Sequence, residues 1–116
     1  FRELEAQVIA ELLTKPEQVI SLGGGALGNE TTRALVKQHV VLWLETGLTQ
    51  AVERVGMNRN RPLLLGNVRG QLSTLMTARE PIYREAATIT VNTSSLSINE
   101  VTQAAMTQLE TVGIKP

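Results

Sequence analysis

The spacing of apolar residues along this chain predicts helices that alternate with short strands. Residues 1–14 place apolar side chains on one helical face, and Pro16 ends this pattern. The same spacing predicts helices at 29–39, from 46 or 47 to 55, at 68–78 and at 98–112, and a short helix that restarts at Pro81. Apolar runs typical of strands buried on both faces occupy residues 19–22, 40–44 and 88–91.

Cap and loop residues separate these elements. Asn29 is a suitable N-cap, and Ser97 with Glu100 forms a capping box before the last helix. Residues 56–66 combine Gly, Asn, Pro and two arginines without periodicity, so we expect a mobile loop. Strands alternating with helices indicate an α/β fold, a parallel sheet with flanking helices. Because three strands make a small sheet and Phe1 is not an initiator methionine, we expect a partial domain.

Composition restricts the classes of function. The formal net charge is zero, so no long-range field attracts nucleic acid or an anionic membrane, and we expect neither as a partner. Without cysteine there are no disulfides, thiolate metal sites or cysteine nucleophiles. All eleven acidic residues are glutamates, and aspartate is the usual ligand for Mg²⁺ beside transferred phosphates. We therefore expect no metal ligand among these residues. We also expect a cytoplasmic protein.

Three glycines, Gly23, Gly24 and Gly25, follow the first predicted strand. Open α/β sheets bind ligands at this end of their strands, and backbone without Cβ atoms approaches a small ligand closely. A tight turn between strand and helix is the alternative interpretation. A phosphate loop is excluded, because Gly23 and Gly28 have its spacing but Asn29 and Glu30 stand where Lys and Ser or Thr are required.

Arginine accounts for eight of the eleven basic residues, which favours planar recognition of carboxylates and phosphates. Arg2 and Glu5 lie three residues apart on one helical face, where they can pair. Arg79 stands at the predicted end of a helix, and Pro62 could direct Arg61 inward from its loop. The alternatives are a surface salt bridge for Arg2 and helix C-terminal capping for Arg79.

Short motifs in the same order resemble the C-terminal two-thirds of shikimate kinases and extend over nearly all 116 residues. They are Phe-Arg-Glu-Leu-Glu at 1–5, Ser-Leu-Gly-Gly-Gly-Ala at 21–26, Arg-Pro-Leu-Leu at 61–64, the spaced Arg79, Pro81, Tyr83 and Ala87, and Val91 with Thr93. The resemblance implies a single partial kinase domain over 1–116, related to P-loop nucleoside monophosphate kinases, with a lid at about 56–66. It departs from the family at Leu96 and Ile98, where an arginine and a proline are usual in the adenine-side loop.

The implied activity is transfer of the γ-phosphoryl group of ATP to the 3-hydroxyl of shikimate, in aromatic amino-acid biosynthesis. ATP, Mg²⁺ and shikimate are the implied cofactors and partners, and we expect a monomer. The family's phosphate loop and metal ligands precede the segment that matches Phe1. We therefore expect these 116 residues alone to be catalytically inactive.

The resemblance also implies individual roles. Arg2 and Arg79 are expected to clamp the carboxylate of shikimate, and Glu5 to orient Arg2. Arg61 is the expected catalytic residue, moving in with the lid to bridge the phosphates, and Arg54 is expected to stack on adenine. The full set expected to bind shikimate is Arg2, Glu5, Gly23, Gly24, Gly25, Pro62, Leu63 and Arg79.

Two other functions stay open from the sequence. One is phosphorylation of another small molecule by a related enzyme, such as a gluconate kinase. The other is a non-catalytic shikimate-binding or regulatory domain. An intact phosphate loop before Phe1 would argue against the second.

Overall fold

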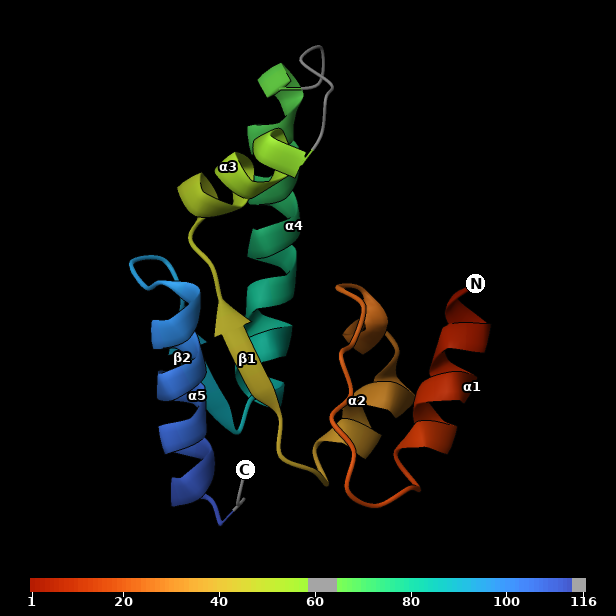
Figure 1. The fold of residues 1–116 in the computed structure, drawn as a ribbon. Helices are drawn as coiled ribbons and strands as arrows, with labels where there is room; N and C mark the ends of the chain where they lie inside the picture. Colours follow the sequence, from red (N-terminus) through yellow and green to blue (C-terminus); the bar gives the residue numbers. More distant parts are fainter. Residues whose placement is uncertain (59–64, 114–116) are drawn as a thin grey trace.

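The computed structural model describes the backbone of residues 1–58 and 65–113 and the side chains of residues 1–53 and 69–113. Two strands, five α-helices and one 3-10 helix are found in the described chain (Figure 1). In chain order they are α1 (Arg2–Leu12), the 3-10 helix η1 (Ala26–Gly28), α2 (Glu30–Val36), β1 (Leu42–Glu45), α3 (Leu48–Asn58), α4 (Leu65–Ala86), β2 (Ile89–Asn92) and α5 (Ile98–Thr111).

The two strands lie side by side and parallel, with Leu42 opposite Ile89 and Glu45 opposite Asn92. A parallel pair needs a long crossover, and α3 with α4 supplies it between β1 and β2. Helix α5 packs against β2 through a core of Ile89, Val91 and Ala105. The predicted α/β fold with a parallel sheet is confirmed.

A second core joins the N-terminal helices to α4. Leu27, Val36 and Ala86 are its buried residues, and Ile82 and Tyr83 pack against them. Figure 1 shows α1 and α2 next to one another on one side of the molecule, with the sheet and α5 on the other. Since α4 contacts η1, this helix connects the two sides. None of the described helices is long and apolar enough to cross a membrane.

The strand predicted at 19–22 does not form. These residues have no regular structure, and Val19 is fully exposed. A strand requires hydrogen-bonded neighbours, and among the described residues only β1 and β2 pair with each other. Leu22 nevertheless packs against the second core, which positions the start of the glycine segment.

The predicted break before Pro81 is also wrong, because α4 continues through it to Ala86. An internal proline costs about 3 kcal/mol through its missing N–H and the clash of its ring. Burial of Ile82, Tyr83 and Ala86 in the second core, all beyond the proline, offsets this cost. As a result Arg79 and Tyr83 lie one turn apart on a single helix.

Strand β1 is less buried than its apolar sequence predicts. It runs over 42–45 rather than 40–44, and Leu42 and Leu44 are 36% and 49% exposed. Only the face with Trp43 is covered, by Tyr83 of α4 at 5.8 Å between ring centroids. The prediction that both faces are buried therefore fails for the described residues.

Both predicted helix caps are confirmed. The Asn29 side chain accepts a hydrogen bond from the backbone N–H of Thr32 at 3.0 Å, and Ser97 with Glu100 makes the reciprocal bonds of a capping box. Helix α2 ends at Val36, three residues before the predicted end. The predicted loop at 56–66 is helical at both margins, since α3 reaches Asn58 and α4 begins at Leu65. Its centre, 59–64, lies outside the described residues.

Candidate functional site

The glycine segment forms a series of tight turns that leads into η1. Backbone N–H groups three residues ahead donate to the carbonyls of Gly23, Gly25 and Ala26 at 3.1, 3.1 and 3.4 Å. None of the three glycines has a positive φ, since Gly113 is the only described glycine in that region. The turn itself therefore does not require glycine at these positions.

Side chains from distant elements explain the glycines. A Cβ on Gly23 would lie 2.9 Å from Glu5 Oε2, and one on Gly24 would lie 2.8 Å from Arg79 Nη1. On Gly25 it would lie 2.5 to 2.9 Å from three atoms of the Arg2 guanidinium. Each glycine thus leaves room for one different polar side chain, which favours a ligand site over a simple turn.

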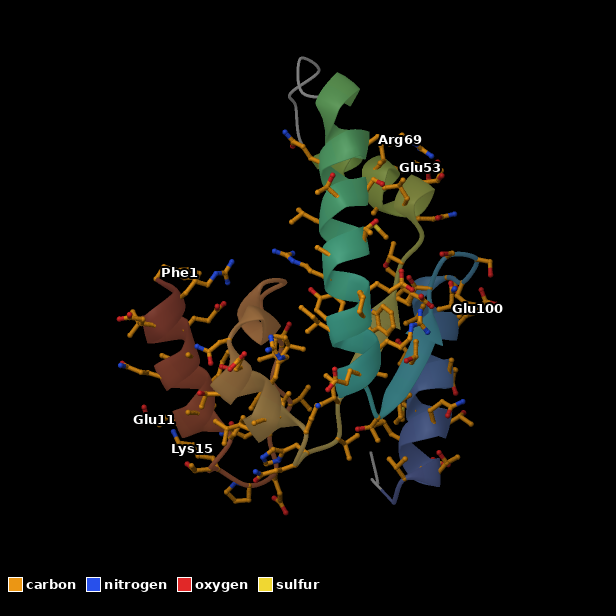
Figure 2. The ribbon with its side chains drawn as sticks, turned by 180° about the vertical axis from the view of Figure 1, so that it is seen from behind. Phe1, Glu11, Lys15, Glu53, Arg69 and Glu100 are labelled. Carbon is orange, nitrogen blue, oxygen red and sulfur yellow. The ribbon has the colours of Figure 1, made fainter. Side chains whose placement is uncertain are left out.

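Arg2 and Glu5 pair as the sequence predicts. Arg2 Nη1 donates to Glu5 Oε1 at 2.7 Å, and the Glu5 side chain is only 15% exposed. The ring of Phe1, at the start of α1 (Figure 2), lies 5.3 Å from the guanidinium. The pair differs from an ordinary surface salt bridge because its carboxylate is largely covered and also adjoins Gly23.

Arg79 does not cap a helix, which corrects one of the two interpretations of this residue. It lies seven residues before the end of α4, so the carbonyls at the helix C-terminus are beyond its reach. It makes no salt bridge with any residue that the structure describes. Its guanidinium adjoins Gly24 and shares a cavity of about 210 Å³ with Arg2. The lining residues are Arg2, Gly24, Gly25, Leu27, Gly28, Arg79, Ile82 and Tyr83.

Two guanidiniums in one cavity define its chemistry. Glu5 can neutralise only one of them, and Arg79 has no described acid beside it. An anion with a planar pair of oxygens would satisfy both charges through charge-assisted hydrogen bonds. The charge of this cavity therefore suits a small ligand that carries a carboxylate or a phosphate.

Tyr83 is a site residue to which the sequence analysis assigned no role. Its hydroxyl donates a short hydrogen bond to the carbonyl of Gly24, and its ring packs against Trp43 at an angle of 58°. Its spacing of four residues from Arg79 was visible in the sequence. That spacing becomes informative only when α4 is known to continue through Pro81.

Charged residues next to the site hold α4 in place. Arg84 contacts Glu80 at 2.6 Å and Glu45 at 3.5 Å, and it lies 5.3 Å from the ring of Trp43. The hydrogen bond to Glu80 raises the pKa of Arg84. These contacts join the last turns of α4 to β1.

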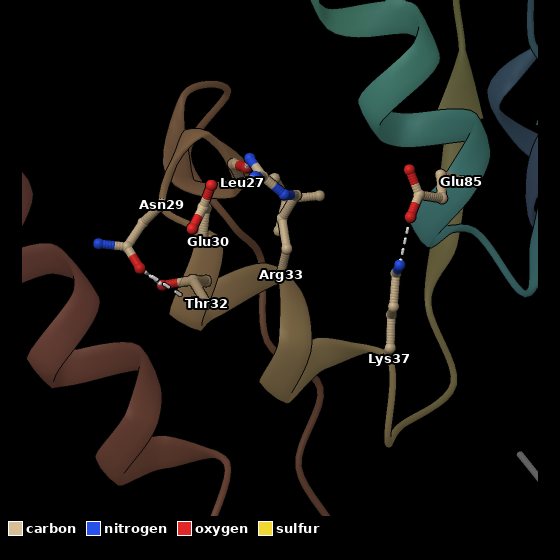
Figure 3. A network of polar contacts seen from close by, with 7 residues as sticks. All are labelled: Leu27, Asn29, Glu30, Thr32, Arg33, Lys37 and Glu85. Carbon is tan, nitrogen blue, oxygen red and sulfur yellow. Dashed lines mark hydrogen bonds and ion pairs between the residues drawn. The ribbon is translucent and has the colours of Figure 1, made fainter.

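A second set of polar contacts joins α2 and η1 to α4 (Figure 3). Arg33 Nη1 donates to the carbonyl of Leu27 at 2.7 Å, so α2 holds η1 directly. Lys37 forms an ion pair with Glu85, and their hydrogen bond lowers the pKa of the Glu85 carboxyl. The glycine segment is therefore tied to the same helix that carries Arg79.

Several expected site residues lie outside this description. Arg61, Pro62 and Leu63 fall within 59–64, and the side chain of Arg54, on α3, is likewise outside the described residues. In the parts of the chain that are described, no three acidic or histidine side chains come close enough to hold a metal ion.

Comparison with known proteins agrees with this geometry. The family model for shikimate kinase matches residues 1–110. Shikimate kinase from Thermobifida fusca is 44% identical over 97% of this chain and 66% of its own length. Shikimate kinase from Streptomyces coelicolor is 42% identical over 95% of this chain and 64% of its own length. A solved structure, shikimate kinase from Acinetobacter baumannii in complex with shikimate, superimposes with a TM-score of 0.84 at 31% identity, over 99% of this chain and 65% of that one.

This chain spans two thirds or less of the length of these relatives, and 53% of the enzyme from Frankia casuarinae, to which it is 40% identical. The match nevertheless includes both helices that carry the arginines and the glycine segment between them. The chain belongs to the shikimate kinase family.

Proposed function

We propose that the protein containing this chain transfers the γ-phosphoryl group of ATP to the 3-hydroxyl of shikimate. The observation that carries the proposal is the cavity in which Arg2 and Arg79 stand over the glycine segment. Family membership supports it, as does a solved relative bound to shikimate. The relatives reported above are all shikimate kinases, which does not favour a gluconate kinase or a non-catalytic domain. We further propose a cytoplasmic monomer acting in aromatic amino-acid biosynthesis.

The cavity suggests a role for each of its polar groups. Arg2 and Arg79 bind the carboxylate of shikimate from two sides, and Glu5 holds Arg2 in place through Oε1. The other oxygen of Glu5, beside Gly23, is available to a substrate hydroxyl. The backbone N–H groups of Gly24 and Gly25, which line the cavity, are further hydrogen-bond donors for the substrate.

The nucleotide-side roles rest on the family resemblance. Arg61 neutralises charge on the phosphates as the catalytic residue, Pro62 and Leu63 close over shikimate, and Arg54 stacks on adenine. ATP and Mg²⁺ supply the phosphoryl group and its charge neutralisation. Because this chain has no aspartate and no phosphate loop, the ligands for both are expected outside these 116 residues.

The first prediction tests the carboxylate clamp. In the full-length protein, Arg2→Ala or Arg79→Ala should raise the KM for shikimate about ten- to a hundredfold, since a charged hydrogen bond contributes about 1.5–3 kcal/mol. The KM for ATP should change little. Steady-state kinetics with each substrate varied in turn measures both.

Arg69→Ala is the matched control for this prediction. Arg69 is an exposed arginine on the upper part of the same helix, α4 (Figure 2). Its replacement should leave the KM for shikimate unchanged. An equal loss of affinity for shikimate and ATP in Arg2→Ala and Arg79→Ala would contradict the clamp, and no turnover of shikimate by the unmodified protein would reject the function.

The second prediction concerns a polypeptide of these 116 residues alone. Phosphoryl transfer depends on positioning and charge neutralisation by a phosphate loop, Mg²⁺ and arginines together. Only the arginines are present here, so ADP release with ATP, Mg²⁺ and shikimate should not exceed background. Turnover approaching that of the full-length protein, assayed beside it, would show that our assignment of roles is wrong.

A further inference from the structure

The carbonyl of Gly24 is bonded differently from its neighbours. The carbonyls of Gly23, Gly25 and Ala26 accept backbone N–H groups three residues ahead, as successive tight turns require. Gly24 interrupts this series and accepts instead from the Tyr83 hydroxyl, 59 residues away. The Gly24 carbonyl is therefore held by a side chain of α4.

This bond controls the direction of a backbone donor. The peptide unit between Gly24 and Gly25 is planar and trans, so its N–H points opposite to its C=O. Fixing the Gly24 carbonyl on Tyr83 therefore fixes the Gly25 N–H. That N–H donates to no other residue that the structure describes, and Gly25 lines the cavity. With no side chains at Gly24 and Gly25 to limit rotation, this peptide would otherwise have many orientations.

The same bond sets the position of Arg79. Tyr83 lies four residues after Arg79, so both side chains extend from one face of α4. At Gly24 they meet one point of backbone, where a Cβ would lie 2.8 Å from Arg79 Nη1 and 3.8 Å from the Tyr83 hydroxyl. The Tyr83 hydroxyl thus fixes the position of α4, which carries Arg79, relative to the glycine segment.

Tyr83 is held firmly enough to act in this way. Its ring contacts Trp43 of β1 and packs against the second core. Arg84 lies 5.3 Å from the ring of Trp43 and is paired with Glu80 and Glu45. The tyrosine is therefore fixed by Trp43 of β1, which does not line the cavity, and by the second core.

We propose that Tyr83 is a positioning residue for shikimate binding, acting through the Gly24 carbonyl on the Gly25 N–H and on Arg79. This inference rests on the function proposed above. It assigns the hydroxyl a role in substrate affinity, separate from the contribution of the ring to packing.

Tyr83→Phe in the full-length protein tests this role, because it keeps the ring and its packing and removes only the hydroxyl. A neutral hydrogen bond contributes about 0.5–1.5 kcal/mol, so the KM for shikimate should rise about two- to tenfold. The KM for ATP should stay the same, and kcat should change less than the KM for shikimate. The melting temperature should be close to that of the unmodified protein.

Thr74→Val is the matched control. Thr74 is also on α4, and its hydroxyl also donates to a backbone carbonyl, that of Gly70 at 3.0 Å, but it does not line this cavity. Its replacement should leave the KM for shikimate unchanged. Unchanged kinetics in Tyr83→Phe, or a loss of melting temperature with equal effects on both substrates, would overturn the proposal. If the unmodified protein does not phosphorylate shikimate, the proposed function fails first and this inference fails with it.

Discussion

Two turns of this molecule each lead from an apolar segment into a helix, but different kinds of contact hold them in place. The glycine segment, 23–25, follows an apolar run and precedes η1 and α2; the turn at 93–97 follows β2 and precedes α5. The second turn is held by its own side chains and by β1. Thr93 donates to the carbonyl of Glu45 through both its N–H and its hydroxyl, at 2.7 and 3.0 Å, and the Ser94 hydroxyl accepts from Gly47 N–H at 2.9 Å.

The glycine segment has no side chains of its own and depends on groups from α1 and α4. Glu5, Arg79 and Arg2 stand over its three residues, and Tyr83 holds its carbonyl. Polar groups at 93–97 bond to Glu45, to Gly47 and within the capping box, whereas the glycine segment leaves the Arg79 guanidinium without a described acidic partner. The comparison supports our proposal that the first turn serves binding and the second serves folding. Substitutions should therefore affect function in one and stability in the other.

Among the substitutions that test this difference between the two turns, Gly25→Ala should have the largest effect. Its Cβ would lie 2.5 to 2.9 Å from three atoms of the Arg2 guanidinium, so we expect this group to be displaced, while the backbone, with φ of −100°, accepts alanine. The KM for shikimate should rise about ten- to a hundredfold, as for loss of Arg2 itself. The melting temperature of the full-length protein should hardly change.

Gly70→Ala, on α4, provides the control. A Cβ at Gly70 meets nothing within 4 Å and Gly70 does not line this cavity, so substrate affinity should be retained. Steady-state kinetics and thermal unfolding of both variants separate the two effects. A Gly25→Ala protein that unfolds at a much lower temperature but binds shikimate normally would show that these glycines serve folding, against our interpretation.

The two turns also show which contacts a sequence can predict. The capping box, the Asn29 cap and the Arg2–Glu5 pair were all predicted, because each joins residues three apart whose geometry a single helical turn fixes. Contacts of Gly24 with Arg79 and Tyr83 span more than fifty residues. They depend on α4 continuing through Pro81, and packing of the residues beyond the proline decides that.

The strand predicted at 19–22 does not form for a related reason. The runs at 19–22 and 88–91 have similar apolar patterns, but only the second has a strand beside it in the described chain. A ladder partner is a non-local property, so the pattern alone could not distinguish the two. The family motifs grouped residues that the structure brings next to one another, namely Arg2, Glu5, Gly23, Gly24, Gly25 and Arg79. Their roles in binding stay predictions.

A smaller effect, on stability alone, is expected from Ser97→Ala at the second turn. This change removes the acceptor for the Glu100 N–H, now at 3.2 Å, and half of the capping box. Loss of an N-cap costs about 1 kcal/mol, which lowers the melting temperature by about 2–8 °C depending on domain size. The KM for shikimate should be unchanged. A rise in that KM as large as the one for Gly25→Ala would remove the distinction between the two turns.

The smallest effect should appear as a pH dependence of the same cap. The backbone N–H of Ser97 and then its side chain lower the pKa of Glu100 below its usual value. A lowered pKa in the folded state means that the carboxylate stabilises the fold fully above the unfolded pKa of about 4.3. This contribution is lost as the pH falls through the lower, folded pKa.

Glu100→Gln isolates this contribution, because glutamine can keep the hydrogen bond to the Ser97 N–H at 2.9 Å but does not titrate. Melting temperatures of the full-length protein between pH 6 and pH 3 should fall less steeply in this variant than in the unmodified protein. Glu110→Gln, at an exposed position in the last turns of α5, is the control and should leave the slope unchanged. If the Glu100→Gln curve runs parallel to that of the unmodified protein, the charge on Glu100 adds nothing to the cap. The second turn would then be held by its neutral hydrogen bonds alone.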